Sequence, residues 1–234
     1  MRTAPSAVHS FEYRLPLSSL ELTLLYAGDV MVHVVKADMD GLVLAAKLVA
    51  EGGIVSYPTD TVYGLGCDPF SEPALDRVMR AKGDRKKPMP VLVKTLQDGL
   101  RIADFTEKAA KLAKRFWPGP LTMVLRAKTT LPKVLVPSGT IGVRSPKHVT
   151  CLNLIGLCSG YLVGTSANQT GKAPATTAEE VVTGLGDKID LVIDGGRAPL
   201  GVASTVVNLS GNFTILREGP ISREALLNCL RNGR

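Results

Sequence analysis

The chain has 234 residues and a mass of 24.8 kDa, is 45% hydrophobic and 21% charged, and carries a formal net charge of +7. A chain of this length and composition can bury a full core, which predicts a globular protein with one main domain. No apolar run approaches the roughly 20 residues of a membrane span, and the N-terminus lacks the apolar core of a signal peptide. We therefore expect a cytoplasmic protein without a membrane partner.

Cysteine and histidine spacing argues against a metal site in the protein. The four cysteines are scattered without a CxxC pair, and the three histidines lack ligand spacing. In a cytoplasmic chain, reduced and mostly buried thiols are the simpler interpretation. The residues concerned are Cys67, Cys151, Cys158, Cys229, His9, His33 and His148.

The positive charge is concentrated in two runs. The first lies between residues 80 and 87, contains Gly83 and is stopped by Pro88, so it is predicted to be a loop. Such a loop suits phosphate, a nucleotide or RNA. The second run, between residues 108 and 115, is explained more simply as a solvated helix face.

Apolar runs and turn residues predict alternating helices and strands from Val34 onward. Asp38 and Ser71 are expected to cap helices that end near Gly52–Gly53 and Lys82. Further helices are predicted at about 96–103, 107–116, 148–156, 177–185 and 221–232. Strands are predicted at 54–58, 90–93, 121–127, 140–146, 161–168 and 190–196, followed by a hairpin that turns at 210–212.

This order of elements predicts an α/β fold in which helices pack on a mixed sheet. Residues 1–32 show no clear caps and no candidate chemistry. An added strand pair, an arm and an extension upstream of Met31 all remain open for them. We divide the chain into an N-terminal extension (1–32) and a main domain (33–234).

Five polar loops follow or interrupt the predicted strands, where open α/β sheets collect ligands. None fits a common motif. Pro69 stands where a dinucleotide fingerprint needs its third glycine, the Gly171–Lys172 pair lacks Walker A spacing, and Ser166 lies in GTSAN and not GxSxG.

The loops instead offer hydrogen-bond donors. Arginine and lysine can bind carboxylate or phosphate oxygens, and the small hydroxyls and glycines let a ligand approach closely. No nucleophile or acid–base pair stands out, so catalysis would act by positioning and charge stabilisation. Thr59, Asp60 and Asn168 have simpler interpretations as turn residues, and Tyr63 as a packed side chain.

The chain resembles the YrdC-like family, whose best-characterised members are threonylcarbamoyl-AMP synthases. The resemblance runs from Val34 to the C-terminus and rests on the strings PTDTVYGLG, KGDRKKPMPVLV, FWPGPLTMVL, GVRSPKH, GTSANQTGKAP, IDGGRAPLGVASTVVN and ILREG. It implies a YrdC-like twisted open mixed sheet flanked by helices, with a concave basic face. It also implies a nucleotidyltransferase that makes threonylcarbamoyl-AMP and pyrophosphate from L-threonine, bicarbonate and ATP. That product serves threonylcarbamoyladenosine modification of tRNA next to the anticodon.

The resemblance assigns the donors to two substrates. Positions that hold threonine match Thr61, Arg144, Ser166 and Ser204, with Arg144 on the carboxylate. Positions around ATP match Lys82, Arg85, Lys87, Thr140, Gly164, Asn168, Pro174 and Arg217, with Lys82 and Arg85 positioning phosphates. Mg²⁺ is expected to arrive with ATP. Downstream threonylcarbamoyl-transfer proteins, and tRNA or double-stranded RNA on the basic face, are the further partners implied.

This sequence departs from the family pattern at several positions. The loop Lys82-Gly83-Asp84-Arg85 is one residue longer than the usual Lys-x-Arg, Leu92 stands where some members have histidine, and Ala203 replaces a common acid. The end at Arg234 suggests a single-domain form. An RNA-binding module and the YrdC-like part of hydrogenase-maturing carbamoyltransferases are the alternatives, although the latter are much longer proteins.

Overall fold

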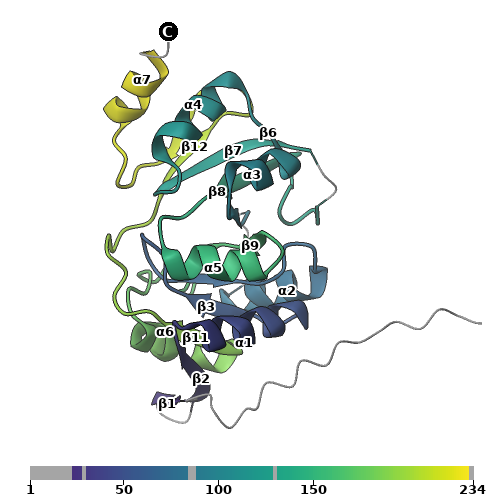
Figure 1. The fold of residues 1–234 in the computed structure, drawn as a ribbon, viewed down its shortest axis with the longest axis vertical. Coiled ribbons are helices and arrows are strands. Elements are labelled where there is room, and N and C mark those ends of the chain that lie inside the picture. The colour runs from purple at the N-terminus through teal and green to yellow at the C-terminus, as the bar shows by residue number, and fades with distance from the viewer. Residues whose placement is uncertain (1–22, 28–29, 84–87, 129–130, 232–234) are drawn as a thin grey trace, which may run out of the picture.

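The computed structural model describes residues 23–27, 30–83, 88–128 and 131–231. Its strands form two twisted mixed sheets (Figure 1). The first sheet has the spatial order β1 (Thr23–Ala27), β2 (Val30–Lys36), β11 (Leu191–Asp194), β3 (Val55–Tyr57), β4 (Gly64–Gly66) and β10 (Thr165–Ser166). The second has the order β13 (Thr214–Arg217), β12 (Thr205–Asn208), β7 (Leu121–Ala127), β8 (Thr140–Arg144), β5 (Val91–Val93) and β9 (Tyr161–Val163), with β6 (Ala103–Asp104) paired to β7.

The two sheets are joined where the chain passes from β9 to β10. The amide of Val163, the last residue of β9, donates to the carbonyl of Cys67 just after β4, with an N–O distance of 2.9 Å. Only Gly164 separates β9 in the second sheet from β10 in the first. The ends of β3, β4, β8 and β10 are thereby brought to one region, where the site is built.

Helices cover both sheets, as the periodic apolar patterns predict. They are α1 (Met39–Ala50), α2 (Glu72–Ala81), α3 (Leu96–Ile102), α4 (Glu107–Phe116), α5 (Val149–Leu157), α6 (Ala178–Leu185) and α7 (Arg223–Arg231), with a short 3₁₀ helix η2 (Gly186–Lys188). In Figure 1, α1 and α5 lie side by side, and α4 and α7 lie at the opposite end. Asp38 and Ser71 accept backbone amides at the starts of α1 and α2, which confirms both predicted caps.

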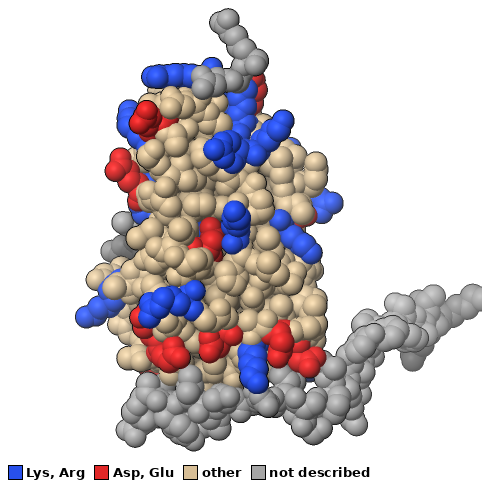
Figure 2. Space-filling model, turned by 60° about the vertical axis from the view of Figure 1, so that its left-hand side comes forward, with Lys and Arg blue, Asp and Glu red and all other residues tan. Residues whose placement is uncertain are grey.

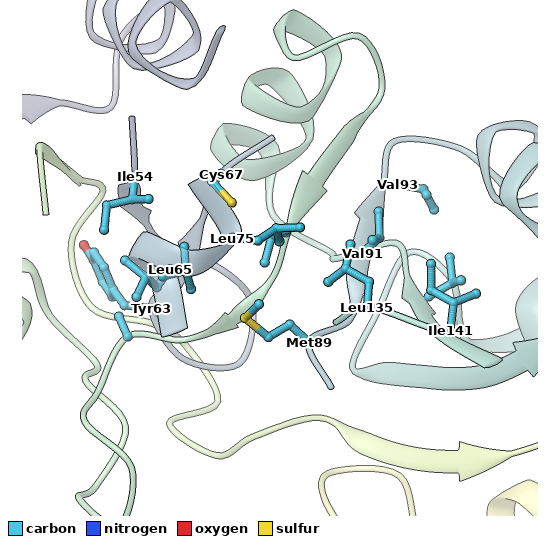
Figure 3. Close-up of a cluster of buried hydrophobic side chains, with 14 of the residues drawn as sticks. Ile54, Tyr63, Leu65, Cys67, Leu75, Met89, Val91, Val93, Leu135 and Ile141 are labelled. Carbon is cyan, nitrogen blue, oxygen red and sulfur yellow. The ribbon is translucent and has the colours of Figure 1, made fainter. Parts of the chain in front are cut away.

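The larger of two buried apolar clusters extends across both sheets. Figure 3 shows Leu65 on β4 with Tyr63 just before it, Val91 and Ile141 on the second sheet, and Leu75 between them. All five side chains are fully buried. A smaller cluster lies under α1 and α5. The continuous core fixes the two sheets relative to each other, and so fixes the loops at their junction.

The N-terminal strands extend the first sheet. β1 pairs antiparallel with β2, and β2 pairs in parallel with β11. Since β2 runs from Val30 to Lys36, it crosses the predicted boundary between residues 32 and 33. The division into an extension and a domain stays a prediction, as does the role of residues 1–32.

The surface in Figure 2 carries both signs of charge. Basic side chains are spread over its upper and middle parts, and acidic ones gather across its lower part. α4 buries Ala109 and Leu112 and exposes Lys108 and Lys114 on its other face. Lys111 pairs with Glu107 at 2.8 Å. This agrees with the solvated-face interpretation of that basic run. Within the described residues, no helix is long and apolar enough to cross a membrane.

Candidate functional site

A small polar cavity lies where the two sheets meet, and a larger cleft adjoins it. The cavity holds about 90 Å³ and the cleft about 590 Å³. Pro90, Thr122 and Arg217 line both spaces, so they form the common wall. The cavity is also lined by Thr59, Thr61, Val62, Tyr63, Gly64, Leu92, Arg144, Gly164, Thr165, Ser166, Ala203 and Ser204. The cleft is also lined by Pro88, Met89, Val124, Thr140, Gly142, Val206, Asn208, Ser210 and Leu216.

The segment 58–63 is the loop of a hairpin between β3 and β4. The Oγ1 atom of Thr59 accepts the amides of Thr61 and Val62 at 3.1 and 3.3 Å, and lies 2.9 Å from the Oγ1 atom of Thr61. Thr59 is therefore a turn residue, as its simpler interpretation predicts. The turn holds the Thr61 hydroxyl against Arg144. Tyr63 is fully buried, and its hydroxyl donates to the carbonyl of Gly196 at 2.8 Å, so it forms a packed wall.

Arg144 lies at the end of β8 and is held by three groups. Its Nε donates to the carbonyl of Gly119 and its Nη1 to the Thr61 hydroxyl, both at 3.0 Å, while its Nη2 pairs with the Asp60 carboxylate. Arg144 is 6% exposed and Asp60 is 4% exposed. Burial lowers the pKa of Arg144, and the charge of Asp60 opposes that shift. The pair therefore fixes a cationic guanidinium in the cavity wall.

Asp60 is the main residue whose role the sequence did not predict. Its place in a polar loop predicts a turn residue, yet it is the buried counter-ion of Arg144. Its Oδ2 atom is buried without a hydrogen-bond partner in the described part of the chain. Its backbone carbonyl accepts a hydrogen bond from the amide of Leu200 at 3.1 Å. This bond fixes the loop that leads to Ser204. Because the partners are 84 positions apart, no local pattern could indicate the pair.

Ser204 joins the opposite wall of the cavity. It is buried at the start of β12, and its Oγ atom lies 2.8 Å from the Oγ1 atom of Thr122 on β7. From β13, Arg217 donates through Nη2 to the Ser204 hydroxyl at 3.1 Å and through Nε to its carbonyl at 2.9 Å. The four residues predicted to hold threonine thus line one cavity: Thr61, Arg144, Ser166 and Ser204.

The residues predicted around ATP are distributed over three places. Thr140 and Arg217 line the larger cleft, and Gly164 lines the small cavity beside it. Asn168 and Pro174 line a separate hollow of about 760 Å³ next to α6. Arg85 and Lys87 lie outside the described residues. Contact of these residues with ATP stays a prediction.

Asn168 shapes its own loop, as its turn interpretation predicts. Its Nδ2 atom donates to the carbonyls of Gln169 and Lys172 at 2.8 and 2.7 Å. Its Oδ1 atom is buried without a hydrogen-bond partner among the residues that the structure describes. The side chain therefore fixes the segment 168–172 through its amide nitrogen, while its amide oxygen is an acceptor without a donor among the described residues.

Lys82 connects α2 to the loop that carries Ser166. It is 1% exposed, and its Nζ atom donates to the carbonyls of Ser166 and Asn168 at 2.5 and 2.7 Å. Charged hydrogen bonds of this kind are stronger than neutral ones. Lys82 thus positions the Ser166 segment, while the phosphate contact predicted for it stays a prediction.

Replacement of Lys82 by methionine is expected to lower the free energy of unfolding by about 2–3 kcal/mol, because two buried carbonyls lose a charged donor. Urea denaturation measures the loss. Arg80→Met, on the exposed side of the same helix end, is the matched control and is expected to change stability by less than about 0.5 kcal/mol. Equal stability of the two variants would show that Lys82 does not hold the loop.

Nucleophilic catalysis by the buried thiols is disfavoured. Burial raises the pKa of Cys67 to about 12 and also raises the pKa of Cys151. Both groups therefore stay protonated at neutral pH, when thiols are poor nucleophiles. The described residues contain no group of three or more His, Cys, Asp or Glu side chains that could hold a metal ion. What the site offers is fixed cations and hydroxyl donors.

Fold and site together define an α/β protein with a charged, hydroxyl-lined ligand pocket at the junction of two sheets. The sequence matches the Sua5/YciO/YrdC family model, described as "Telomere recombination", over residues 47–219. The chain belongs to this family.

Two curated relatives and one solved structure illustrate the similarity. The threonylcarbamoyl-AMP synthase of Pyrococcus abyssi is 39% identical over 71% of this chain and 50% of its own length. That of Bacillus subtilis is 37% identical over 78% of this chain and 54% of its own. The structure of P. abyssi Sua5 complexed with L-threonine matches with a TM-score of 0.78 and 37% identity, over 81% of this chain and 57% of that one. This chain therefore spans about half the length of these relatives.

Proposed function

We propose that this chain is an L-threonylcarbamoyladenylate synthase, a nucleotidyltransferase that uses L-threonine, bicarbonate and ATP. One observation carries the proposal: the four residues that match the family's threonine positions line one cavity, and it shares a wall with a nucleotide-sized cleft. The relatives named above support it, because they are threonylcarbamoyl-AMP synthases and one is solved with L-threonine.

In this proposal the small cavity binds the amino acid. Arg144 takes the carboxylate, because a guanidinium held on three sides presents its remaining N–H groups in a fixed direction. The hydroxyls of Thr61, Ser166 and Ser204 bind the polar groups of threonine. Burial of the site excludes water, which strengthens each of these interactions.

The larger cleft receives ATP beside the amino acid. The deprotonated amine attacks bicarbonate, which gives a carbamate and water. A carbamate oxygen then bonds to the α-phosphorus, the bond from that phosphorus to the bridging oxygen breaks, and pyrophosphate leaves with the electron pair. The protein holds carbamate and phosphate in line, and Arg217 places positive charge at the wall between them.

Mg²⁺ and the remaining partners complete the proposal. Among the residues that the structure describes, none that lines the cavity or the cleft is a carboxylate. In this proposal the phosphates of ATP carry Mg²⁺, which neutralises charge on pyrophosphate. The product would pass to downstream transfer proteins for tRNA modification in the cytoplasm. Binding of tRNA or double-stranded RNA by basic surface residues is part of the same proposal.

Pyrophosphate release tests the proposed function. Release is expected only when L-threonine, bicarbonate and ATP are all present, and omission of any one should reduce it to background. The assay uses buffer depleted of CO₂, because dissolved CO₂ would replace added bicarbonate. Release from ATP without threonine would overturn the proposed reaction.

A further inference from the structure

At the wall between the small cavity and the larger cleft, here called the two compartments, the Thr122 and Ser204 hydroxyls lie close together. Thr122 is assigned to neither threonine nor ATP. Thr122 on β7 lies opposite Val206 on β12 in a parallel register, and this brings its side chain to Ser204 just before β12. Thr122 and Ser204 are each 4% exposed, yet both line the small cavity. Of the two, Thr122 also lines the cleft.

The hydrogen bonding of this pair leaves one proton over. Two hydroxyl groups carry two protons, and the 2.8 Å contact between their oxygens uses one of them. Arg217 donates to the Ser204 hydroxyl oxygen, which therefore acts as an acceptor. Whichever hydroxyl donates to the other, the second O–H has no acceptor among the described residues, and it belongs to a residue that lines the small cavity.

The remaining donor is suited to an anionic oxygen. Donation from a guanidinium into a chain of hydroxyls polarises the chain and strengthens the last donor. An acceptor in contact with that donor also lies in the field of the Arg217 charge, 3.1 Å from the Ser204 oxygen. A small oxyanion fits this arrangement better than a neutral group does.

We propose that Thr122, together with Ser204 and Arg217, forms the subsite for bicarbonate and for the carbamate made from it. This inference rests on the proposed function and deepens it. If threonine lies in the small cavity and ATP in the cleft, the carbon that joins the amine to the α-phosphate must lie at their common wall. Among the described residues, those that line both compartments are Pro90, Thr122 and Arg217, and Pro90 has neither a side-chain donor nor a backbone N–H.

In this subsite the leftover hydroxyl donates to an oxygen of bicarbonate. After the amine has attacked and water has left, the same donor holds one carbamate oxygen, so that the other points toward the α-phosphate. Thr122 is therefore either the donor to the one-carbon unit or the group that orients the Ser204 hydroxyl as that donor. Loss of the Thr122 hydroxyl should raise the KM for bicarbonate more than it raises the KM for threonine or for ATP.

The variant Thr122→Val tests the proposal, since valine keeps the shape and removes the hydroxyl. Initial rates of pyrophosphate release are measured in CO₂-depleted buffer with each substrate varied in turn. We expect the KM for bicarbonate to rise roughly 10- to 100-fold, the range for a lost hydrogen bond to a charged group. The KM values for threonine and ATP should stay within about twofold.

Three further variants make the result specific. Thr122→Ser keeps the hydroxyl and is expected to retain the bicarbonate KM of the parent. Thr140→Val makes the same change in a residue that lines only the cleft, so its bicarbonate KM should also stay within about twofold. Thr122→Ala is a second hydroxyl-free variant, and is used if the valine variant does not fold, as judged by circular dichroism.

The outcomes separate this inference from the proposed function. A parent chain that releases no pyrophosphate with all three substrates would overturn both. An active parent with an unchanged bicarbonate KM in the Thr122→Val or Thr122→Ala variant would overturn the subsite alone. If the KM for ATP or for threonine rose more than the KM for bicarbonate, Thr122 would belong to the site of ATP or of threonine. That result would also overturn the bicarbonate subsite.

Discussion

Replacement of Arg144 by alanine is expected to raise the threonine KM about 100-fold or more, while the ATP KM changes less than about threefold. Each hydrogen bond to a charged group contributes roughly 1.5–3 kcal/mol, and a guanidinium can give a carboxylate two of them. Steady-state pyrophosphate release with threonine and ATP varied separately measures both constants. Equal increases in the two would contradict the assignment of Arg144 to the amino acid.

The same replacement is expected to lower the free energy of unfolding by about 3–5 kcal/mol, because it leaves the buried Asp60 carboxylate unpaired. The exposed pair of Lys47 and Glu51, 4.0 Å apart, supplies the control. Glu51→Ala should cost less than about 0.5 kcal/mol in urea denaturation. If Arg144→Ala cost no more than the control, the buried pair would not stabilise the fold.

A double variant separates binding from folding. Asp60→Asn combined with Arg144→Met removes both buried charges, so much of the lost stability should return. Threonine binding should not return, since the guanidinium is still missing. Recovery of threonine binding together with stability would contradict a direct role for Arg144.

Replacement of Gly66 by alanine is expected to destabilise the fold by about 3 kcal/mol or more. A Cβ atom at this position would lie 2.1 Å from the carbonyl oxygen of Val163 and 3.0 Å from the ring of Tyr57. Backbone cannot move aside as a flexible side chain can, so the cost should reach or exceed the upper end of overpacking. The variant would loosen the junction between β4 and β9, which positions the cavity.

Gly184→Ala provides the opposite control. Gly184 lies in α6, and a Cβ atom there would meet nothing within 4 Å. The change is therefore expected to stabilise the protein by about 0.5–1 kcal/mol, as alanine favours helix over glycine. Thermal and urea unfolding of both variants give the comparison. A Gly66→Ala protein as stable as the parent would show that the close approach at the junction is not required.

Local patterns predicted the regular elements well. The caps at Asp38 and Ser71, the apolar strand of β7 and the hairpin of β12 and β13 all follow from signals within a few residues. The resemblance to the family correctly predicted the mixed α/β fold. The four residues that it matches to the threonine positions all line the cavity, and their contact with threonine stays a prediction.

The short strand β4 is not predicted by the sequence, and the strand predicted at 161–168 is divided into β9 and β10 at Gly164. β4 consists of Gly64, Leu65 and Gly66, and glycine normally weakens a strand. The structure explains both glycines, because a Cβ atom at Gly64 would lie 2.6 Å from the Tyr57 ring. At Gly66 the neighbouring backbone is the carbonyl of Val163, and at Gly64, which lines the cavity, the close neighbour is the Tyr57 ring. The contact of Gly66 with Val163 depends on a residue far away in the sequence.

Long-range pairing explains the other differences at the site. The buried pair of Asp60 and Arg144, the contact of Thr122 with Ser204, and the burial of Lys82 each join segments more than 80 positions apart. A sequence shows which of these residues can donate or accept. Which of them meet depends on how the two sheets pack.

The most direct test of the account follows labelled carbon from bicarbonate into a nucleotide product. The chain is incubated with L-threonine, ATP and ¹³C-labelled bicarbonate, and the products are analysed immediately by mass spectrometry. The account predicts an AMP adduct that contains both threonine and the label, formed in proportion to pyrophosphate. ATP consumption without a labelled threonine–AMP adduct would contradict it.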